Sequence, residues 1–142
     1  NIIRSAFAER LLRRALGSGS HTTISSAGLY AIPGNPAHQN AVLTAMPRSI
    51  DHRGHAAWPL TRERVAASDL ILVMDVWQVV ELVRRFPDAR EKTVLFTCLA
   101  PKLPLEVEDP VNGDRPVFEA CFDHIARAAG PLVHAMSAHN RA

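Results

Sequence analysis

The sequence is poor in the features that mark several common classes of protein. Its two cysteines, Cys98 and Cys121, show neither a CxxC pattern nor the spacing of metal ligands. This excludes a disulfide-rich scaffold and a cysteine-based zinc site, and it predicts two reduced, buried thiols in a cytoplasmic protein. No apolar run approaches the roughly 18 residues that a membrane-spanning helix requires, so no membrane insertion is expected.

Neither sign of charge predominates. Sixteen Lys and Arg residues against fourteen Asp and Glu residues give a net charge of +2, which is too near neutral to indicate a nucleic-acid-binding protein. Hydrophobic residues make up 47% of the 142 positions and charged residues 21%, a balance typical of one folded domain with a core. The sequence begins at Asn1 with no initiator Met and no signal peptide, so we expect a domain truncated at its N-terminus.

Helical and strand-like patterns alternate along the chain. Residues 5–16 place apolar side chains on one face and three arginines on the other, which predicts a helix that Gly17 ends. The continuous apolar run at 70–74 is typical of a strand covered on both faces in a parallel sheet. The other expected elements are strands at 22–26 and 93–96, helices opened by Pro36 and Thr61, a helix at 76–86, and a last helix at about 116–139 with a break near Pro131.

Strands that alternate with helices predict an open α/β fold, with a parallel sheet and helices on both faces. In such a fold a strand normally leads into each helix, but the helix at 5–16 has no strand before it. We therefore expect the first strand immediately upstream of Asn1, outside the sequence.

Residues 1–5 open the first helix with a pattern suited to an anion. Successive backbone N–H groups at a helix start form a concave site for negative charge, and Arg4 can donate a forked pair of hydrogen bonds to two phosphate oxygens. Asn1 tolerates a tight loop conformation, and Ser5 is a candidate N-cap. The alternative is a plain capped helix with a solvated Arg4.

A second candidate is Asp109, within the turn-forming segment 108–114. This segment is either an ordinary surface turn or a loop that holds a general acid at the mouth of a site. The residues alone do not choose between these two interpretations.

Other polar residues are expected to be structural. Ser26 and His55 stand near element boundaries, where a satisfied structural role is the default. Asp75 follows the strand at 70–74 and is expected to cap the next helix. Five further histidines show no ligand spacing and are expected on the surface or on helices: His21, His52, His124, His134 and His139.

Each signal is weak alone, but their order along the chain is specific. It runs through Asn-Ile-x-Arg-Ser at 1–5, Ser-Ala-Gly at 26–28, Gly-Asn-Pro-Ala at 34–37, a His before a Leu-Thr helix start at 55–61, Asp-Leu-Ile-Leu-Val-Met-Asp at 69–75 and Glu-Asp-Pro at 108–110. This order resembles the low-molecular-weight protein tyrosine phosphatases from position 1 to about 136. Residues 117–122 are most similar to the bacterial branch, which includes enzymes that regulate exopolysaccharide synthesis.

The resemblance implies a phosphotyrosine phosphatase I-like fold, a three-layer open parallel sheet similar to flavodoxin-like folds, without its first strand. It also implies a phosphate loop with the family signature Cys-x5-Arg-Ser, whose nucleophilic Cys stands three residues before Asn1. Arg4 would grip the phosphate oxygens in the transition state, and Ser5 would hydrogen-bond the thiolate and keep its pKa low. The residues that would bind the phosphate are Asn1, Ile2, Ile3, Arg4 and Ser5.

Further roles follow from the same resemblance. Asn1, Ser26 and His55 would hold the loop in shape, and the ring of Tyr30 would stack on the substrate. Asp109 would protonate the leaving phenolate and then activate water, so that hydrolysis passes through a cysteinyl-phosphate without a metal or cofactor. The substrate would be a phosphotyrosine protein, with a bacterial tyrosine kinase as a candidate partner.

Besides the missing first strand, the sequence departs from this family at the nucleophile and after Asp109. Neither Cys98 nor Cys121 matches the position of the nucleophile, so the chain from Asn1 onward is expected to be inactive by itself. The aromatic pair that follows Asp-Pro in many eukaryotic members is replaced by Val111 and Asn112, which leaves aromatic stacking to Tyr30. Two alternatives stay open: a catalytically inactive module that binds a phosphorylated ligand, and an arsenate reductase, which needs two further cysteines close together.

Overall fold

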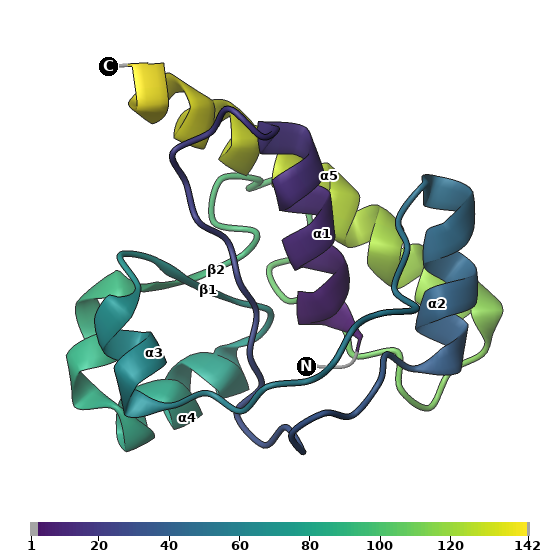
Figure 1. Cartoon of the computed structure of the whole chain (residues 1–142), viewed down its shortest axis with the longest axis horizontal. Helices are drawn as coiled ribbons and strands as arrows, with labels where there is room; N and C mark the ends of the chain where they lie inside the picture. Colours follow the sequence, from purple (N-terminus) through teal and green to yellow (C-terminus); the bar gives the residue numbers. More distant parts are fainter. Residues whose placement is uncertain (1–2, 142) are drawn as a thin grey trace.

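The computed structural model describes residues 3–141 of the chain (Figure 1). Its helices and strands are, in chain order, α1 (Arg4–Leu16), α2 (Gln39–Ala45), the 3-10 helix η1 (Met46–Arg48), α3 (Arg62–Ala67), β1 (Ile71–Val73), α4 (Val76–Arg85), the 3-10 helix η2 (Pro87–Lys92), β2 (Thr93–Leu95) and α5 (Arg115–Arg141). Every helix between residues 3 and 141 is too short or too polar to span a lipid bilayer. Asn1 and Ile2, which we assign to the phosphate loop, lie outside the described residues.

The unit β1-α4-β2 is the βαβ arrangement that the sequence predicts. The two strands are parallel, with Ile71 opposite Thr93 and Val73 opposite Leu95. Parallel strands need a crossover connection, and α4 supplies it. The unit places the end of β1 and the start of α4 next to each other, and the candidate site lies at this junction.

Helices cover both faces of this sheet, as predicted (Figure 1). On the face that carries Leu72, α1, α2 and α5 form a core in which the rings of Phe7 and Phe122 stack with centroids 4.0 Å apart. On the face that carries Ile71 and Val73, α3, α4 and η2 form a smaller core. Successive strand residues point to opposite faces, so the apolar run of β1 serves both cores.

Residues 22–26 do not form the strand that their β-branched pattern predicts. A strand requires a hydrogen-bonded partner, and no segment between residues 3 and 141 pairs with this one. The guanidinium of Arg13 instead donates to the carbonyl of Ile24. The expected strand upstream of Asn1 concerns residues outside the sequence and stays a prediction.

Three predictions about the helices differ from the structure. Ile3 is the N-cap residue of α1, which begins at Arg4, so Ser5 is not the cap. Pro36 does not open a helix, because it joins an isolated bridge and α2 begins three residues later. The last helix runs through Pro131 without the predicted break. Proline removes one backbone hydrogen bond there, while apolar residues on both sides of it stay buried in the main core.

Two side chains lie in environments opposite to those predicted. His52, expected on the surface or on a helix, is 1% exposed in the loop after η1, with its ring centroid 6.2 Å from that of Phe7. Cys98, expected in the core, is exposed in the turn after β2, whereas Cys121 is buried as predicted. Both errors fall in or beside loops, where no helical or strand period indicates which side chains point inward.

Candidate functional site

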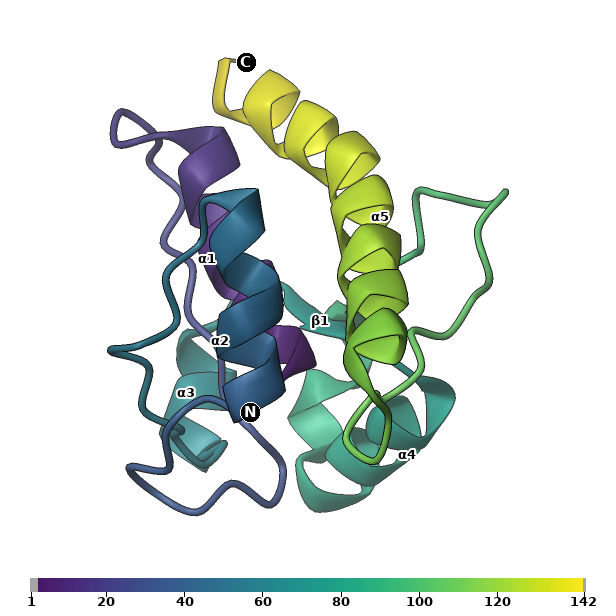
Figure 2. The same ribbon diagram turned by 90° about the vertical axis from the view of Figure 1, so that its right-hand side faces the viewer.

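Several chain segments meet at the carboxyl end of the sheet. The loop that follows β2 returns to β1, and the N–H of Val107 donates to the carbonyl of Met74 at 2.8 Å. The same end holds the N-termini of α1 and α4 and the loop that leads into α5 (Figure 2). Open α/β sheets bind ligands at the carboxyl ends of their strands, so this end is the candidate site.

Arg4 lies at the centre of this end of the molecule. Its Nη1 donates to Asp75 Oδ2 at 2.9 Å and to the carbonyl of Val107 at 2.6 Å. Its Nη2 lies 3.8 Å from Asp109 Oδ2, and its side chain is 11% exposed. Arg4 is therefore not the solvated residue of the alternative interpretation, because two fixed partners on different loops hold one edge of its guanidinium.

Asp75 links the site to α4 through its two carboxylate oxygens. Oδ1 accepts a hydrogen bond from the N–H of Gln78 at 2.8 Å, which confirms Asp75 as the N-cap of α4. Oδ2 binds Arg4. Sequence reasoning assigned Asp75 only the cap. The signal that could have indicated more is its place at the carboxyl end of a predicted parallel strand.

The structure brings Asp109 to Arg4, on a tightly turned loop. Asp109 Oδ1 accepts from the N–H of Val111 at 3.2 Å, and the N–H of Gly113 donates to the carbonyl of Pro110 at 2.8 Å. A Cβ at Gly113 would lie 2.6 Å from Val117 Cβ, so this turn requires glycine. The turn leaves the Asp109 side chain half exposed at 50%, where a small molecule can reach it.

Of the remaining predicted phosphate-loop residues, the structure describes Ile3 and Ser5. The Ile3 side chain is buried in the main core, so any role of this residue in the site belongs to its backbone. Ser5 is partly buried in the first turn of α1. The first N–H groups of a helix lack intrahelical partners and lie at the positive end of the helix dipole, which favours an anion beside Arg4.

Ser26 and His55 lie together against α1. Both line a hollow of about 280 Å³ with Glu9 and Arg10. The Ser26 hydroxyl donates to the Glu9 carboxylate, which also pairs with Arg13 at 3.0 Å. The structure thus brings these two predicted support residues to one place, beside the second turn of α1.

Tyr30 lies on the loop before α2 and is held against α4. Its hydroxyl donates to the carboxylate of Glu81, and Arg85 Cζ lies 5.3 Å from the centroid of its ring. The ring of Trp77 is a neighbour of the Tyr30 ring, with centroids 6.1 Å apart. Most of the Tyr30 side chain is nevertheless exposed, so an aromatic ligand can contact it.

The two cysteines lie in different environments. Burial raises the pKa of Cys121 to about 12, although Arg4 acts in the opposite direction. Cys98 lies in the exposed turn after β2. Across residues 3–141, no group of three or more His, Cys, Asp and Glu side chains is placed to hold a metal ion.

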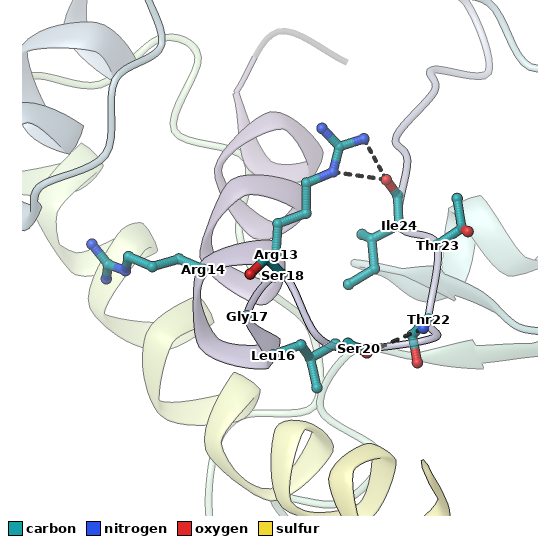
Figure 3. Close-up of a pocket in the computed structure, with 9 residues that line it drawn as sticks. All are labelled: Arg13, Arg14, Leu16, Gly17, Ser18, Ser20, Thr22, Thr23 and Ile24. Carbon is teal, nitrogen blue, oxygen red and sulfur yellow. Dashed lines mark hydrogen bonds between the residues drawn. The ribbon is translucent and has the colours of Figure 1, made fainter.

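A larger hollow, of about 560 Å³, lies at the opposite end of α1 and is lined by residues within 13–24 (Figure 3). Arg13 donates to the carbonyl of Ile24, as the dashed lines show, and Arg14 donates to the carbonyl of Arg48 at 2.6 Å. Because the guanidinium groups of both arginines bind backbone carbonyls, we assign this hollow a structural role only.

Known proteins match the sequence along nearly its whole length. A sequence profile described as low molecular weight phosphotyrosine protein phosphatase matches residues 1–142. The probable low molecular weight protein-tyrosine-phosphatase AmsI of Erwinia amylovora is 36% identical over 137 residues, covering 96% of this chain and 92% of AmsI. The low molecular weight protein-tyrosine-phosphatase Wzb of Escherichia coli K12 is 32% identical over 138 residues, covering 97% of this chain and 90% of Wzb.

Solved structures agree with the sequence comparison. The crystal structure of AmsI matches with a TM-score of 0.88 and covers 96% of this chain and 87% of its own. Vibrio vulnificus Wzb in complex with benzylphosphonate matches with a TM-score of 0.87 at 30% identity, covering 95% of this chain and 92% of its own. These matches confirm the α/β fold class. The chain belongs to the low molecular weight phosphotyrosine protein phosphatase family.

Proposed function

We propose that the protein hydrolyses phosphotyrosine in protein substrates, with Arg4 and Asp109 as catalytic residues. The observation that carries this assignment is the 3.8 Å approach of Arg4 Nη2 to Asp109 Oδ2 at the start of α1. Removing a phosphoryl group from a phenol requires a cation for the phosphate oxygens and an acid for the leaving oxygen. The names of AmsI and Wzb, and the benzylphosphonate on the Vibrio protein, support the same chemistry.

The phosphate would bind in front of the first turn of α1. The first N–H groups of α1 lack intrahelical partners, and they would bind the phosphate oxygens together with the guanidinium of Arg4. Asp75 and the carbonyl of Val107 hold Arg4 before the substrate arrives. A guanidinium that is already oriented needs no rearrangement when charge develops on the equatorial oxygens, which is the condition for strong transition-state stabilisation.

We propose that the nucleophile is a cysteine thiolate three positions upstream of Asn1 in the full-length protein. Neither cysteine of this chain stands six positions before Arg4, and burial raises the pKa of Cys121 in the core. Residues 1–142 and that upstream segment would together make a single phosphatase domain. Determining the gene sequence before Asn1 tests this directly: a Cys at that position supports it, and Ser, Gly or Asp there contradicts it.

Hydrolysis would proceed in two steps. In the first, the thiolate bonds to phosphorus as the bond to the phenolic oxygen breaks, and Asp109 gives its proton to that oxygen. In the second, ionised Asp109 takes a proton from water as the water oxygen bonds to phosphorus. The bond between sulfur and phosphorus then breaks, which restores the thiolate and releases inorganic phosphate. The half-exposed side chain of Asp109 is accessible to both the phenol and the water.

We place the reaction in the cytoplasm, because a thiolate nucleophile needs a reducing compartment. The proposed partner is a protein that carries phosphotyrosine, with a bacterial tyrosine kinase as the candidate. A role in regulating exopolysaccharide synthesis is proposed from the resemblance to the bacterial branch.

The test is the Asp109→Asn variant of the full-length protein, with Glu108→Gln as a matched control on the same loop. We expect Asp109→Asn to lower the turnover of a phosphotyrosine peptide by about 10²- to 10⁴-fold. Turnover of p-nitrophenyl phosphate should fall much less, because nitrophenolate leaves without a proton. Equal losses on both substrates would contradict the role of Asp109, and no hydrolysis of either substrate by the wild type would favour the inactive binding module.

A further inference from the structure

An aromatic pair borders the candidate site and is built from two separate elements. Tyr30 comes from the loop before α2 and Trp77 from the first turn of α4, with ring centroids 6.1 Å apart and planes inclined by 35°. Both side chains are exposed, at 67% and 58%. Two neighbouring rings that remain so open have apolar surface to offer a ligand.

The pair is held in place by ionic and polar contacts behind it. The Tyr30 hydroxyl donates to Glu81, and Arg84 donates to the same carboxylate through Nε at 3.0 Å and Nη2 at 2.6 Å. Arg84 and Tyr30 lower the pKa of Glu81 to about 2, so the carboxylate stays charged at neutral pH. Arg85 lies over the Tyr30 ring and donates to the carbonyl of Leu29. The loop that carries Tyr30 is therefore tied to α4.

Trp77 is close to the phosphate end of the site through the chain itself. Asp75, which binds Arg4 at 2.9 Å, is the N-cap of α4, and Trp77 is the second residue of that helix. Two Cα steps separate them, so their Cα atoms are at most about 7.6 Å apart. This short separation puts Trp77 within reach of the phenyl ring of a phosphotyrosine whose phosphate contacts Arg4.

We propose that Trp77 is a specificity-determining residue that forms, with Tyr30, a fixed aromatic wall against the phenyl ring of the substrate. This inference rests on the proposed function and names the part of the site that selects aryl over alkyl phosphates. The inference also explains how the site can contact a phenyl ring although Val111 and Asn112, which follow Asp109, have no aromatic side chain. We place the wall on α4, whose N-cap Asp75 binds Nη1 of Arg4, and not on the loop of Asp109, which approaches Nη2.

The experiment measures the binding of two ligands to the full-length protein by calorimetry: benzylphosphonate, which carries a ring, and inorganic phosphate, which does not. The variants are Trp77→Ala, Trp77→Phe and, as a matched control, Trp58→Ala. Trp58 is equally exposed at 57%, but it lies beside Arg64 and His55 in the smaller hollow. All three changes are at exposed side chains, so their folding is expected to be retained.

Trp77→Ala should weaken benzylphosphonate binding by about two- to tenfold, the range of an aromatic pair contact. Trp77→Phe should restore most of that binding, and Trp58→Ala should change neither ligand. Phosphate binding should be the same in every variant. In a double-mutant cycle, Tyr30→Ala combined with Trp77→Ala should lose less than the two single losses multiplied, because the two rings form one wall.

Three results would overturn the inference. If Trp77→Ala binds benzylphosphonate as tightly as the wild type does, Trp77 is not part of the wall. If Trp77→Ala loses phosphate binding as much as benzylphosphonate binding, the role of Trp77 is merely structural. An equal effect of Trp58→Ala would show that any exposed tryptophan matters. If the wild type hydrolyses aryl phosphates but Trp77→Ala behaves as wild type, this inference alone fails. If the wild type binds neither ligand, the proposed function fails with it.

Discussion

We expect His52 to lower the stability of the folded protein in mild acid. Its side chain is 1% exposed, and in the described part of the chain neither of its ring nitrogens has a hydrogen-bond partner. Burial is the main cause that lowers its pKa from 6.5 to about 4, and the charges of Arg10 and His55 add to this. Asp51 acts in the opposite direction and does not compensate.

The sign of the effect follows from proton binding. Between pH 6.5 and about 4 the unfolded chain binds a proton at His52 that the folded chain does not, so stability falls as pH falls through this range. Each pKa unit corresponds to about 1.4 kcal/mol. The full difference therefore removes about 3 kcal/mol of the free energy of unfolding by the time the pH reaches about 4.

The His52→Leu variant should abolish this dependence, because leucine fills the apolar site and does not titrate. It should also be more stable than the wild type at every pH, since the two unpartnered ring nitrogens are removed. Urea unfolding at pH 7.5, 6, 5 and 4 gives the free energy of unfolding for both proteins. His134→Leu, at an exposed position of α5, serves as the control and should keep the wild-type slope. An unchanged pH slope in His52→Leu would refute this account of His52.

Three further predictions concern the site and the core. Arg4→Lys should lower kcat/KM for p-nitrophenyl phosphate at least about 100-fold, since an ammonium cannot fork two oxygens; near-normal kinetics would remove Arg4 from catalysis. Asp75→Asn should lower kcat/KM through lost orientation of Arg4 while thermal stability stays near wild type, because Asn is also a good N-cap; a loss of stability without a kinetic change would contradict this. Phe7→Ala should cost about 3–5 kcal/mol in urea unfolding, because Phe7 is fully buried against Phe122; a loss below about 1 kcal/mol would not fit that packing.

Sequence reasoning was strongest where a residue type and its neighbours define the local structure. Thr61 and Asp75 cap their helices as predicted, because an N-cap depends on a side chain reaching an N–H two or three residues ahead. It failed for residues 22–26, whose β-branched pattern requires a partner that no local pattern can supply. It also failed at Ser5, because one residue of difference in a helix start changes which side chain can act as a cap.

In the candidate site, too, some features could be predicted from local motifs and others depend on contacts between distant residues. Arg4 at a helix start and Asp109 in a turn could be singled out from local motifs and their order. Their 3.8 Å approach, and the link from Arg4 through Asp75 to α4, join residues far apart in the chain. Trp77 carries no motif at all, and its place beside Tyr30 follows from how α4 packs against the loop before α2.

What the amino-acid sequence determined on its own is the alternation of helices and strands, the parallel βαβ unit and the candidate charged residues, because these depend on periodicity and on interactions over a few residues. Only the tertiary structure decided that His52 is buried, that Cys98 is exposed and that Tyr30 and Trp77 share one wall. Those outcomes depend on contacts between segments distant in sequence, which form only when the elements pack together.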